Sequence, residues 1–157
     1  ENLLGAEGGG FIALVKNLQN ERLTLGAQAL GECAAALELT LAYVTQRKAF
    51  GSPLWDRQVI RHRLAMLATR VAAARAFLYM TAWRDGRGET LIKEVSMIKA
   101  LCGELVNEVM YDCLQFHGGS GYMRESTIER MTRDARVQSI GGGATEVMLE
   151  EVAKRLG

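Results

Sequence analysis

Proline is nearly absent from this sequence, and its absence permits long uninterrupted helices. Pro53 is the single proline among 157 residues, and aromatic residues make up only 6%. Proline breaks helix interiors because it lacks a backbone N–H and clashes with the preceding turn. The sequence contains no stretch in which apolar and polar residues alternate, the pattern that would favour β-strands. The chain is therefore predicted to be all-α, and its length suits one domain with a buried core.

The sequence also lacks a strong charge of either sign and any long apolar run. Its formal net charge is +1, and charged residues make up 24%. Nucleic acid and anionic membrane surfaces attract strongly basic chains, so neither is expected as a partner. No apolar run approaches the roughly 20 residues of a membrane-spanning helix, so no membrane span is expected.

Cysteine and histidine are too few for the common metal centres. Cys33, Cys102 and Cys113 lie within helical patterns and are predicted to be buried free thiols of a reducing compartment. His62 and His117 do not follow a glutamate at the spacing of a di-iron bundle. No cysteine and histidine cluster has zinc-ligand spacing. We therefore expect no metal site.

Apolar residues repeat at alternating spacings of four and three, which is typical of helices packed side by side. The predicted helices cover about 11–18, 19–48, 57–84, 89–117, 126–137 and the residues after 143. Three long helices and a shorter closing one predict an antiparallel up-and-down four-helix bundle with short additional helices. Asn20 is predicted to cap the first long helix, so that Glu21 would lie in its first turn, where the helix dipole favours an anion.

Each long helix is expected to bury one line of side chains. The first line is Leu23, Ala27, Leu30, Ala34, Leu37, Leu41 and Val44. The second is Ile60, Leu64, Leu67, Val71, Ala74, Leu78 and Thr81. The third is Val95, Ile98, Cys102, Leu105 and Val109.

Residues that could carry chemistry gather at the breaks between helices. They lie in "LQNERL" (18–23), "QRKAFGSPLWDRQ" (46–58), "QFHGGSGYM" (115–123) and "SIGGGATEVM" (139–148). Taken singly, each stretch also has an ordinary explanation. Basic residues suit a helix C-terminus, glycines end helices, and a carboxylate suits an exposed helix surface.

Taken in order, these stretches resemble the C-terminal helical domain of the acyl-CoA dehydrogenases. The resemblance rests on Glu-Arg-Leu at 21–23, Arg-x-x-Phe-Gly at 47–51, Gln-x-x-Gly-Gly-x-Gly-Tyr at 115–122 and Ile-x-x-Gly-x-Thr-Glu at 140–146. It covers nearly the whole sequence and includes "GAEGGGF" at 5–11. The family's N-terminal helical domain and middle β domain have no counterpart here. We therefore expect residues 1–157 to form one domain of a longer polypeptide.

The resemblance implies an FAD-dependent enzyme that removes hydrogens from the α and β carbons of an acyl-CoA thioester. A carboxylate takes the α proton, and the β hydrogen passes as hydride to the flavin. The resemblance further implies a homotetramer or homodimer, an electron-transfer flavoprotein as electron acceptor, and a place in the bacterial cytoplasm or mitochondrial matrix without secretion. The isolated domain is expected to be inactive. An acyl-CoA oxidase and a non-catalytic helical interaction module remain open alternatives.

The resemblance also assigns roles to single residues. Flavin contacts are implied for Arg47, Phe50, Gln58, Gln115, Gly118, Gly119, Thr145 and Glu146. Of these, Arg47 and Phe50 match positions that reach the FAD of a neighbouring subunit. Arg47 suits a pyrophosphate because its guanidinium is charged and forked.

Gly142 stands where many family members carry their catalytic glutamate. The long-chain and isovaleryl branches lack that residue and carry the base in the Glu-Arg-Leu segment, which is at Glu21 here. A glycine at 142 would leave room for a carboxylate from another helix. The resemblance thus implies that Glu21 is the base, that Arg22 supports the local structure, and that backbone near Gly142 and Gly143 binds the thioester oxygen. Loss of dehydrogenation is the competing explanation.

Overall fold

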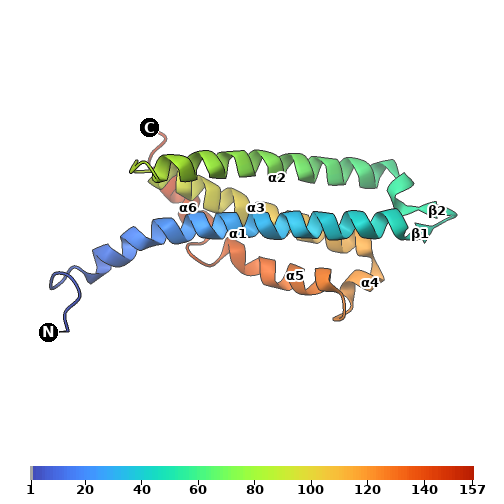
Figure 1. Ribbon diagram of the computed structural model, residues 1–157, viewed down its shortest axis with the longest axis horizontal. Coiled ribbons are helices and arrows are strands. Elements are labelled where there is room, and N and C mark those ends of the chain that lie inside the picture. The colour runs from blue at the N-terminus through green and yellow to red at the C-terminus, as the bar shows by residue number, and fades with distance from the viewer. Residues whose placement is uncertain (1) are drawn as a thin grey trace.

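The computed structural model describes residues 2–157, and Glu1 lies outside the described residues. Three long helices, each antiparallel to the one before it, form most of the fold: α1 (Gly10–Gln46), α2 (Gln58–Asp85) and α3 (Ile92–His117). The shorter α5 (Thr127–Ala135) returns alongside them (Figure 1). The prediction of an all-α up-and-down bundle is confirmed.

Short elements connect and close the bundle. A small antiparallel hairpin, β1 (Lys48–Ala49) and β2 (Ser52–Pro53), follows α1, and the 3-10 helix η1 (Leu54–Asp56) leads into α2. The remaining elements are α4 (Gly119–Tyr122), the 3-10 helix η2 (Arg136–Ser139) and α6 (Thr145–Ala153). The sequence missed the hairpin, because two-residue strands carry no alternation. It also missed α4, which forms inside the glycine cluster.

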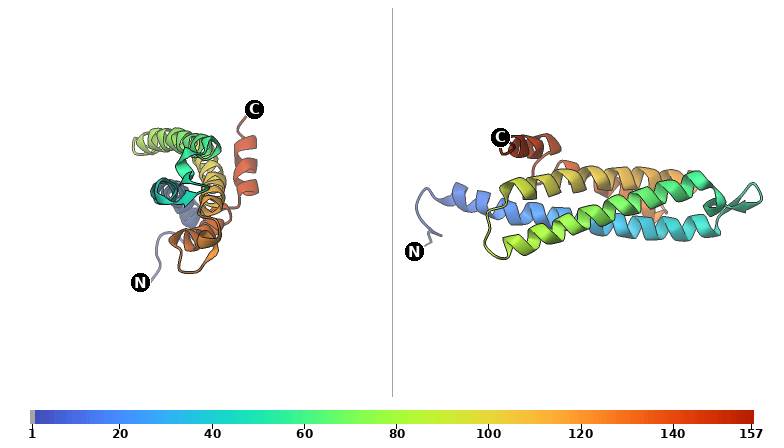
Figure 2. Two further views of the ribbon diagram at one scale, coloured as in Figure 1. Left: turned by 90° about the vertical axis from the view of Figure 1, so that its right-hand side faces the viewer. Right: turned by 90° about the horizontal axis from the view of Figure 1, so that it is seen from above.

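Helix α3 lies at the centre of the fold and contacts α1, α2, α5 and α6. Figure 2 shows this arrangement end-on, with α2 and α6 on opposite sides of α3. Helix α1 approaches α3 so closely that a Cβ at Gly26 would lie 2.6 Å from Cγ2 of Ile98. The close approach sets the position of everything that α1 carries, including Glu21.

The prediction that Asn20 begins a helix is wrong. Helix α1 starts at Gly10 and includes both the expected short helix at 11–18 and the long one. No glycine or proline interrupts residues 11–25, so the helix continues, and the Thr24 hydroxyl donates to the Asn20 carbonyl within it. Glu21 is therefore well inside α1, and the stabilisation expected of a first-turn anion does not apply to it.

The other helix boundaries agree with the prediction more closely. Helix α2 differs from 57–84 by one residue at each end. Helix α3 begins at Ile92 rather than Glu89, whose carboxylate instead pairs with Arg84 at 2.8 Å across the turn. Helix α6 ends at Ala153 and does not continue to the end of the chain.

The predicted core lines are confirmed for α2 and α3 and partly wrong for α1. All seven predicted positions of α2 and all five of α3 are buried. The residues that α1 buries are Gly26, Ala29, Leu30, Cys33, Ala36, Thr40 and Val44. Leu41 is 44% exposed, because small side chains occupy the face of α1 that meets α3.

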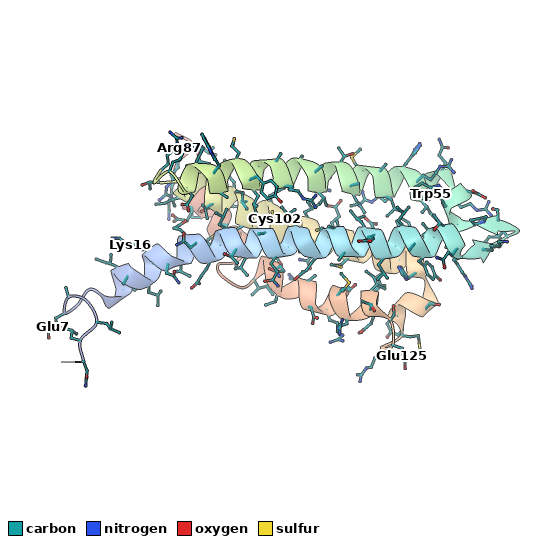
Figure 3. All side chains as sticks on the ribbon, viewed as in Figure 1. Glu7, Lys16, Trp55, Arg87, Cys102 and Glu125 are labelled. Carbon is teal, nitrogen blue, oxygen red and sulfur yellow. The ribbon has the colours of Figure 1, made fainter. Side chains whose placement is uncertain are left out.

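The three cysteines are buried free thiols, as predicted. Cys102 lies in the middle of the bundle in Figure 3. Burial raises the pKa of Cys33 to about 12 and that of Cys102 to about 11. Within residues 2–157, none of the helices is long and apolar enough to cross a bilayer.

Candidate functional site

The structure separates the candidate residues into two groups at opposite ends of the bundle. Glu21 lies within α1 and Arg47 is the C-cap of that helix, 26 positions further along, or about 39 Å at 1.5 Å per residue. Figure 3 shows the two ends, with Lys16 on the first turns of α1 and Trp55 beside the hairpin. One group surrounds Glu21, and the other surrounds the hairpin.

Glu21 and Gly142 line the same pocket although they are far apart in the sequence. The pocket measures about 440 Å³ and is lined by Asn17, Asn20, Glu21, Thr24, Leu25 and Gly142. The Glu21 carboxylate is exposed and accepts a hydrogen bond from the Asn17 amide at 2.7 Å. A carboxylate in an open pocket can accept a proton from a bound molecule.

Residues 141–143, here called the glycine loop, lie against α1 beside Glu21. The Arg22 guanidinium donates through Nε to the Gly142 carbonyl at 3.0 Å. Gly142 has φ +69° and Gly143 has φ +118°, values that side-chain-bearing residues rarely adopt. A Cβ at Gly142 would lie 2.4 Å from Cδ1 of Leu25. The prediction that a glycine here leaves room for a carboxylate is therefore wrong for the space directly over Gly142, because Leu25 fills it.

Both ends of the glycine loop are held by α3. Before the loop, a Cβ at Gly103 would lie 2.9 Å from the Gln138 carbonyl oxygen, so α3 and η2 are in backbone contact. After the loop, the Thr145 hydroxyl donates to the Glu104 carboxylate at 3.0 Å. Thr145 and Glu146 begin α6, as predicted. These contacts fix the loop relative to the helix core.

Lys99 is a fully buried lysine on the same side of α3 as these contacts. It is 1% exposed, and its ammonium has no hydrogen-bond partner. Burial lowers the pKa of Lys99, and the neighbouring Arg22 guanidinium lowers it further, whereas Glu104 and Glu146 act in the opposite direction. The predicted core line of this helix did not include Lys99.

The hairpin end presents an exposed aromatic residue on a strained backbone. Phe50 is 98% exposed and has φ +52°, the one non-glycine residue of the described chain with a positive φ. Arg57 lies over its ring at 6.0 Å and donates to the Ala49 carbonyl at 3.1 Å. Strain and exposure together are typical of a residue that contacts another molecule. Arg47 and Gln58 are exposed at the same end.

The glycine pair after α3 lies near this same end. The Gly118 N–H donates to the Gln115 carbonyl at 3.1 Å, so Gly118 caps the helix. A Cβ at Gly118 or Gly119 would meet nothing within 4 Å, which leaves open space over both residues. Gln115 is exposed beside them.

His117 fixes the start of this glycine pair to α1. Its ring stacks on Tyr43 with centroids 4.2 Å apart, and the Tyr43 hydroxyl donates to the His117 carbonyl at 3.2 Å. Burial lowers the pKa of His117. The residue is therefore neutral and structural near pH 7.

No group of three or more His, Cys, Asp and Glu residues in the 2–157 range is placed to hold a metal ion. The sequence interpretation named the two groups of residues but missed two participants near Glu21. Leu25 could have been found from its spacing, since it follows Glu21 by one helical turn. Lys99 could have been found as a charged residue one turn after Val95 of the predicted core line.

Comparison with known proteins agrees with this geometry. The family described as "Acyl-CoA dehydrogenase, C-terminal domain" matches residues 8–157. The long-chain specific acyl-CoA dehydrogenase of mouse mitochondria is 40% identical over 98% of this chain and 36% of its own length. Acryloyl-CoA reductase (NADH) of Anaerotignum propionicum is 40% identical over 98% of this chain and 40% of its own length.

Solved structures agree as well. The crystal structure of a probable acyl-CoA dehydrogenase from Mycobacterium abscessus superimposes with a TM-score of 0.96 at 42% identity, covering 99% of this chain and 42% of that one. The chain thus spans about 40% of the length of the curated relatives it matches. The family model matches residues 8–157, and the helical fold agrees with that match. The chain therefore belongs to the family of acyl-CoA dehydrogenase C-terminal domains.

Proposed function

We propose that this chain is the base-bearing domain of an FAD-dependent acyl-CoA dehydrogenase, with Glu21 as the base. The single observation that carries the proposal is the pocket that Glu21 shares with Gly142. In much of the family, by the resemblance above, the base is a glutamate at the position of Gly142. Here a carboxylate from α1 reaches the same pocket, so the acceptor is present although it comes from another element.

The proposed reaction balances with one base and one oxidant. The Glu21 carboxylate takes the α hydrogen as a proton, and the electron pair it leaves forms the double bond between the α and β carbons. When bound, FAD supplies the oxidant and accepts the β hydrogen together with its electron pair. The thioester oxygen needs hydrogen-bond donors while negative charge develops on it. We assign this role to the backbone N–H groups of Gly142 and Gly143, and the assignment is supported by the pocket that Gly142 shares with Glu21.

The surroundings of Glu21 suit a base that works only in the assembled site. The carboxylate is exposed here, and Leu25 provides an apolar wall one turn away. A bound acyl chain would cover Leu25 and exclude water from the pocket. Carboxylates become stronger bases where water is excluded. Arg22 would hold the glycine loop through its bond to the Gly142 carbonyl.

Residues at both ends of the bundle fit FAD, but one molecule cannot touch both ends. At the Glu21 end, the glycine loop adjoins Thr145 and Glu146 at the start of α6. At the hairpin end, the open space over Gly118 and Gly119 adjoins Gln115, Arg47, Phe50 and Gln58. We infer that each end serves a different FAD, so that the active protein is a homodimer or homotetramer in which subunits share cofactors.

The proposal is tested by adding acyl-CoA to the full-length protein without oxygen. A dehydrogenase loses the absorbance of oxidised flavin and forms the α,β-unsaturated acyl-CoA. An electron-transfer flavoprotein then restores turnover. Purified full-length protein that holds no FAD, or whose FAD no acyl-CoA bleaches, contradicts the proposal. Oxygen uptake without an added acceptor identifies an acyl-CoA oxidase instead.

A second candidate is reduction of an unsaturated acyl-CoA by the same residues. It is favoured by the 40% identity to a relative named acryloyl-CoA reductase (NADH). The groups that remove a proton in one direction deliver it in the other, so the site geometry suits both. Measuring whether an acyl-CoA bleaches the oxidised flavin, or an enoyl-CoA reoxidises the reduced protein, decides which direction predominates.

A further inference from the structure

The burial of Lys99 is at odds with the usual behaviour of charged side chains. Among the lysines, arginines, aspartates and glutamates of residues 2–157, Lys99 is the fully buried one. Its Nζ has no hydrogen-bond partner in the described part of the chain. An unpaired buried ammonium destabilises a fold, because the lost hydration is not replaced. An apolar residue at this position would serve packing better.

The position of Lys99 on α3 places it beside the glycine loop. Lys99 and Gly103 are one turn apart and so share a face of the helix. At Gly103, α3 contacts the backbone of Gln138, just before the loop. At Glu104, it is bonded to Thr145, just after the loop. Lys99 therefore lies on the part of α3 that holds both ends of the glycine loop.

One further cation, Arg22, and two carboxylates, Glu104 and Glu146, lie near Lys99. Arg22 is close enough to act on the Lys99 ammonium, and it lies against the loop through the Gly142 carbonyl. The nearby carboxylates of Glu104 and Glu146 are on exposed residues, and Glu104 already accepts from Thr145. Two cations thus lie close together on the protein side of the loop. Charges of one sign at one place stabilise the opposite charge beside them.

We propose that Lys99 is the buried cation that stabilises negative charge on the flavin held over the glycine loop. Lys99 is buried and does not touch the flavin. Its charge acts across the glycine loop and Arg22, so Lys99 is a positioning residue. This inference rests on the proposed function and deepens it. Reduction adds two electrons to the bound flavin, and a nearby cation favours the reduced form. Lys99 therefore raises the reduction potential of the FAD.

The test is the midpoint potential of FAD in the full-length protein with Lys99→Met. Methionine has nearly the same shape without the charge, so it fills the buried position. The equilibrium ratio of reduced to oxidised flavin should fall about tenfold, which lowers the potential by about 30 mV for a two-electron couple. Lys99→Arg keeps the charge and should stay nearer the wild-type potential. Lys93→Met is the matched control, because Lys93 lies on α3 and donates only to the Arg155 carbonyl.

The outcomes separate the inference from the proposed function. Wild-type protein without FAD, or without reduction by acyl-CoA, contradicts the proposed function itself. Wild-type protein that is reduced normally, with Lys99→Met at an unchanged potential, overturns only the role of Lys99. A drop of equal size in Lys99→Arg also overturns it, since that variant retains the charge. Loss of FAD from Lys99→Met but not from Lys99→Arg supports it.

Discussion

Replacing Gly142 with alanine tests the geometry of the glycine loop. Gly142 has φ +69°, and a left-handed conformation costs a side-chain-bearing residue about 1–2 kcal/mol. The new Cβ would lie 2.4 Å from Cδ1 of Leu25 and force that side chain off its rotamer, which costs about 0.5–1.5 kcal/mol. Alanine recovers about 0.4–1 kcal/mol by restricting the unfolded chain. We expect Gly142→Ala to destabilise the chain by about 1–2 kcal/mol.

Gly141→Ala is the matched control in the same loop. A Cβ at residue 141 would lie 3.5 Å from the Val137 carbonyl oxygen and 3.7 Å from Cγ2 of Val137, which are ordinary contact distances. This variant should be neutral or more stable by up to about 1 kcal/mol. The two free energies of unfolding, from urea titrations followed by circular dichroism, should differ by about 2 kcal/mol. Equal stability of the two variants would refute this reasoning.

A double-mutant cycle with Leu25→Ala separates strain from steric contact. Leu25→Ala removes the contact but leaves the φ angle of residue 142, so only the steric part of the Gly142→Ala cost should disappear. The coupling free energy should be about 0.5–1.5 kcal/mol. A coupling of zero would show that Leu25 does not fill the space over Gly142.

Three further perturbations follow from the packing and the pKa shifts. Gly26→Ala should destabilise the chain by about 1–3 kcal/mol, because its Cβ would meet Ile98. Gly31→Ala should stabilise the chain, because its Cβ would meet nothing within 4 Å. The urea midpoints of the two variants check both expectations. Burial raises the pKa of the three cysteine thiols, so a thiol reagent at pH 8 should label them only on unfolding; fast labelling of the native chain contradicts this. The pKa of His117 is lowered in the folded state, so its contribution to stability is complete above about pH 6.5 and is lost as the pH falls toward the lowered pKa. His117→Phe keeps the stack on Tyr43 and should remove this part of the pH dependence, measured as the difference between the two stability curves.

The sequence predicted the helices whose core lines are made of large residues. Helix α2 buries seven side chains at alternating spacings of four and three, and its bounds agree to one residue. Four of the seven residues that α1 buries are glycine, alanine or cysteine, because α1 lies so close to α3 at Gly26. Hydrophobic periodicity is detected through large side chains. It therefore selected the leucines of α1 and missed the small residues with which α1 contacts α3. Asn20 misled for a related reason: a capping residue acts only where the preceding chain is not helical.

The candidate site was predictable in its motif residues but not in their neighbours. The resemblance already paired Glu21 with Gly142, and the fold gives the two residues one pocket. The motifs also indicated the hairpin residues, and the predicted helix over 19–48 already separated Arg47 from Glu21 by its length. Lys99 and Leu25 belong to no motif. Their importance comes from what they contact, which periodicity does not reveal.

The most direct test of the account is the rate of flavin reduction in full-length protein with Glu21→Gln. Glutamine keeps the size of Glu21 and its bond partner Asn17 but cannot take the α proton. General-base catalysis contributes about 10²–10⁴ to a rate, so anaerobic bleaching by acyl-CoA should slow by that factor while FAD and acyl-CoA still bind. Glu38→Gln, an exposed glutamate on the same helix, should bleach at the wild-type rate. Bleaching of Glu21→Gln at the wild-type rate would contradict the assignment of Glu21 as the base.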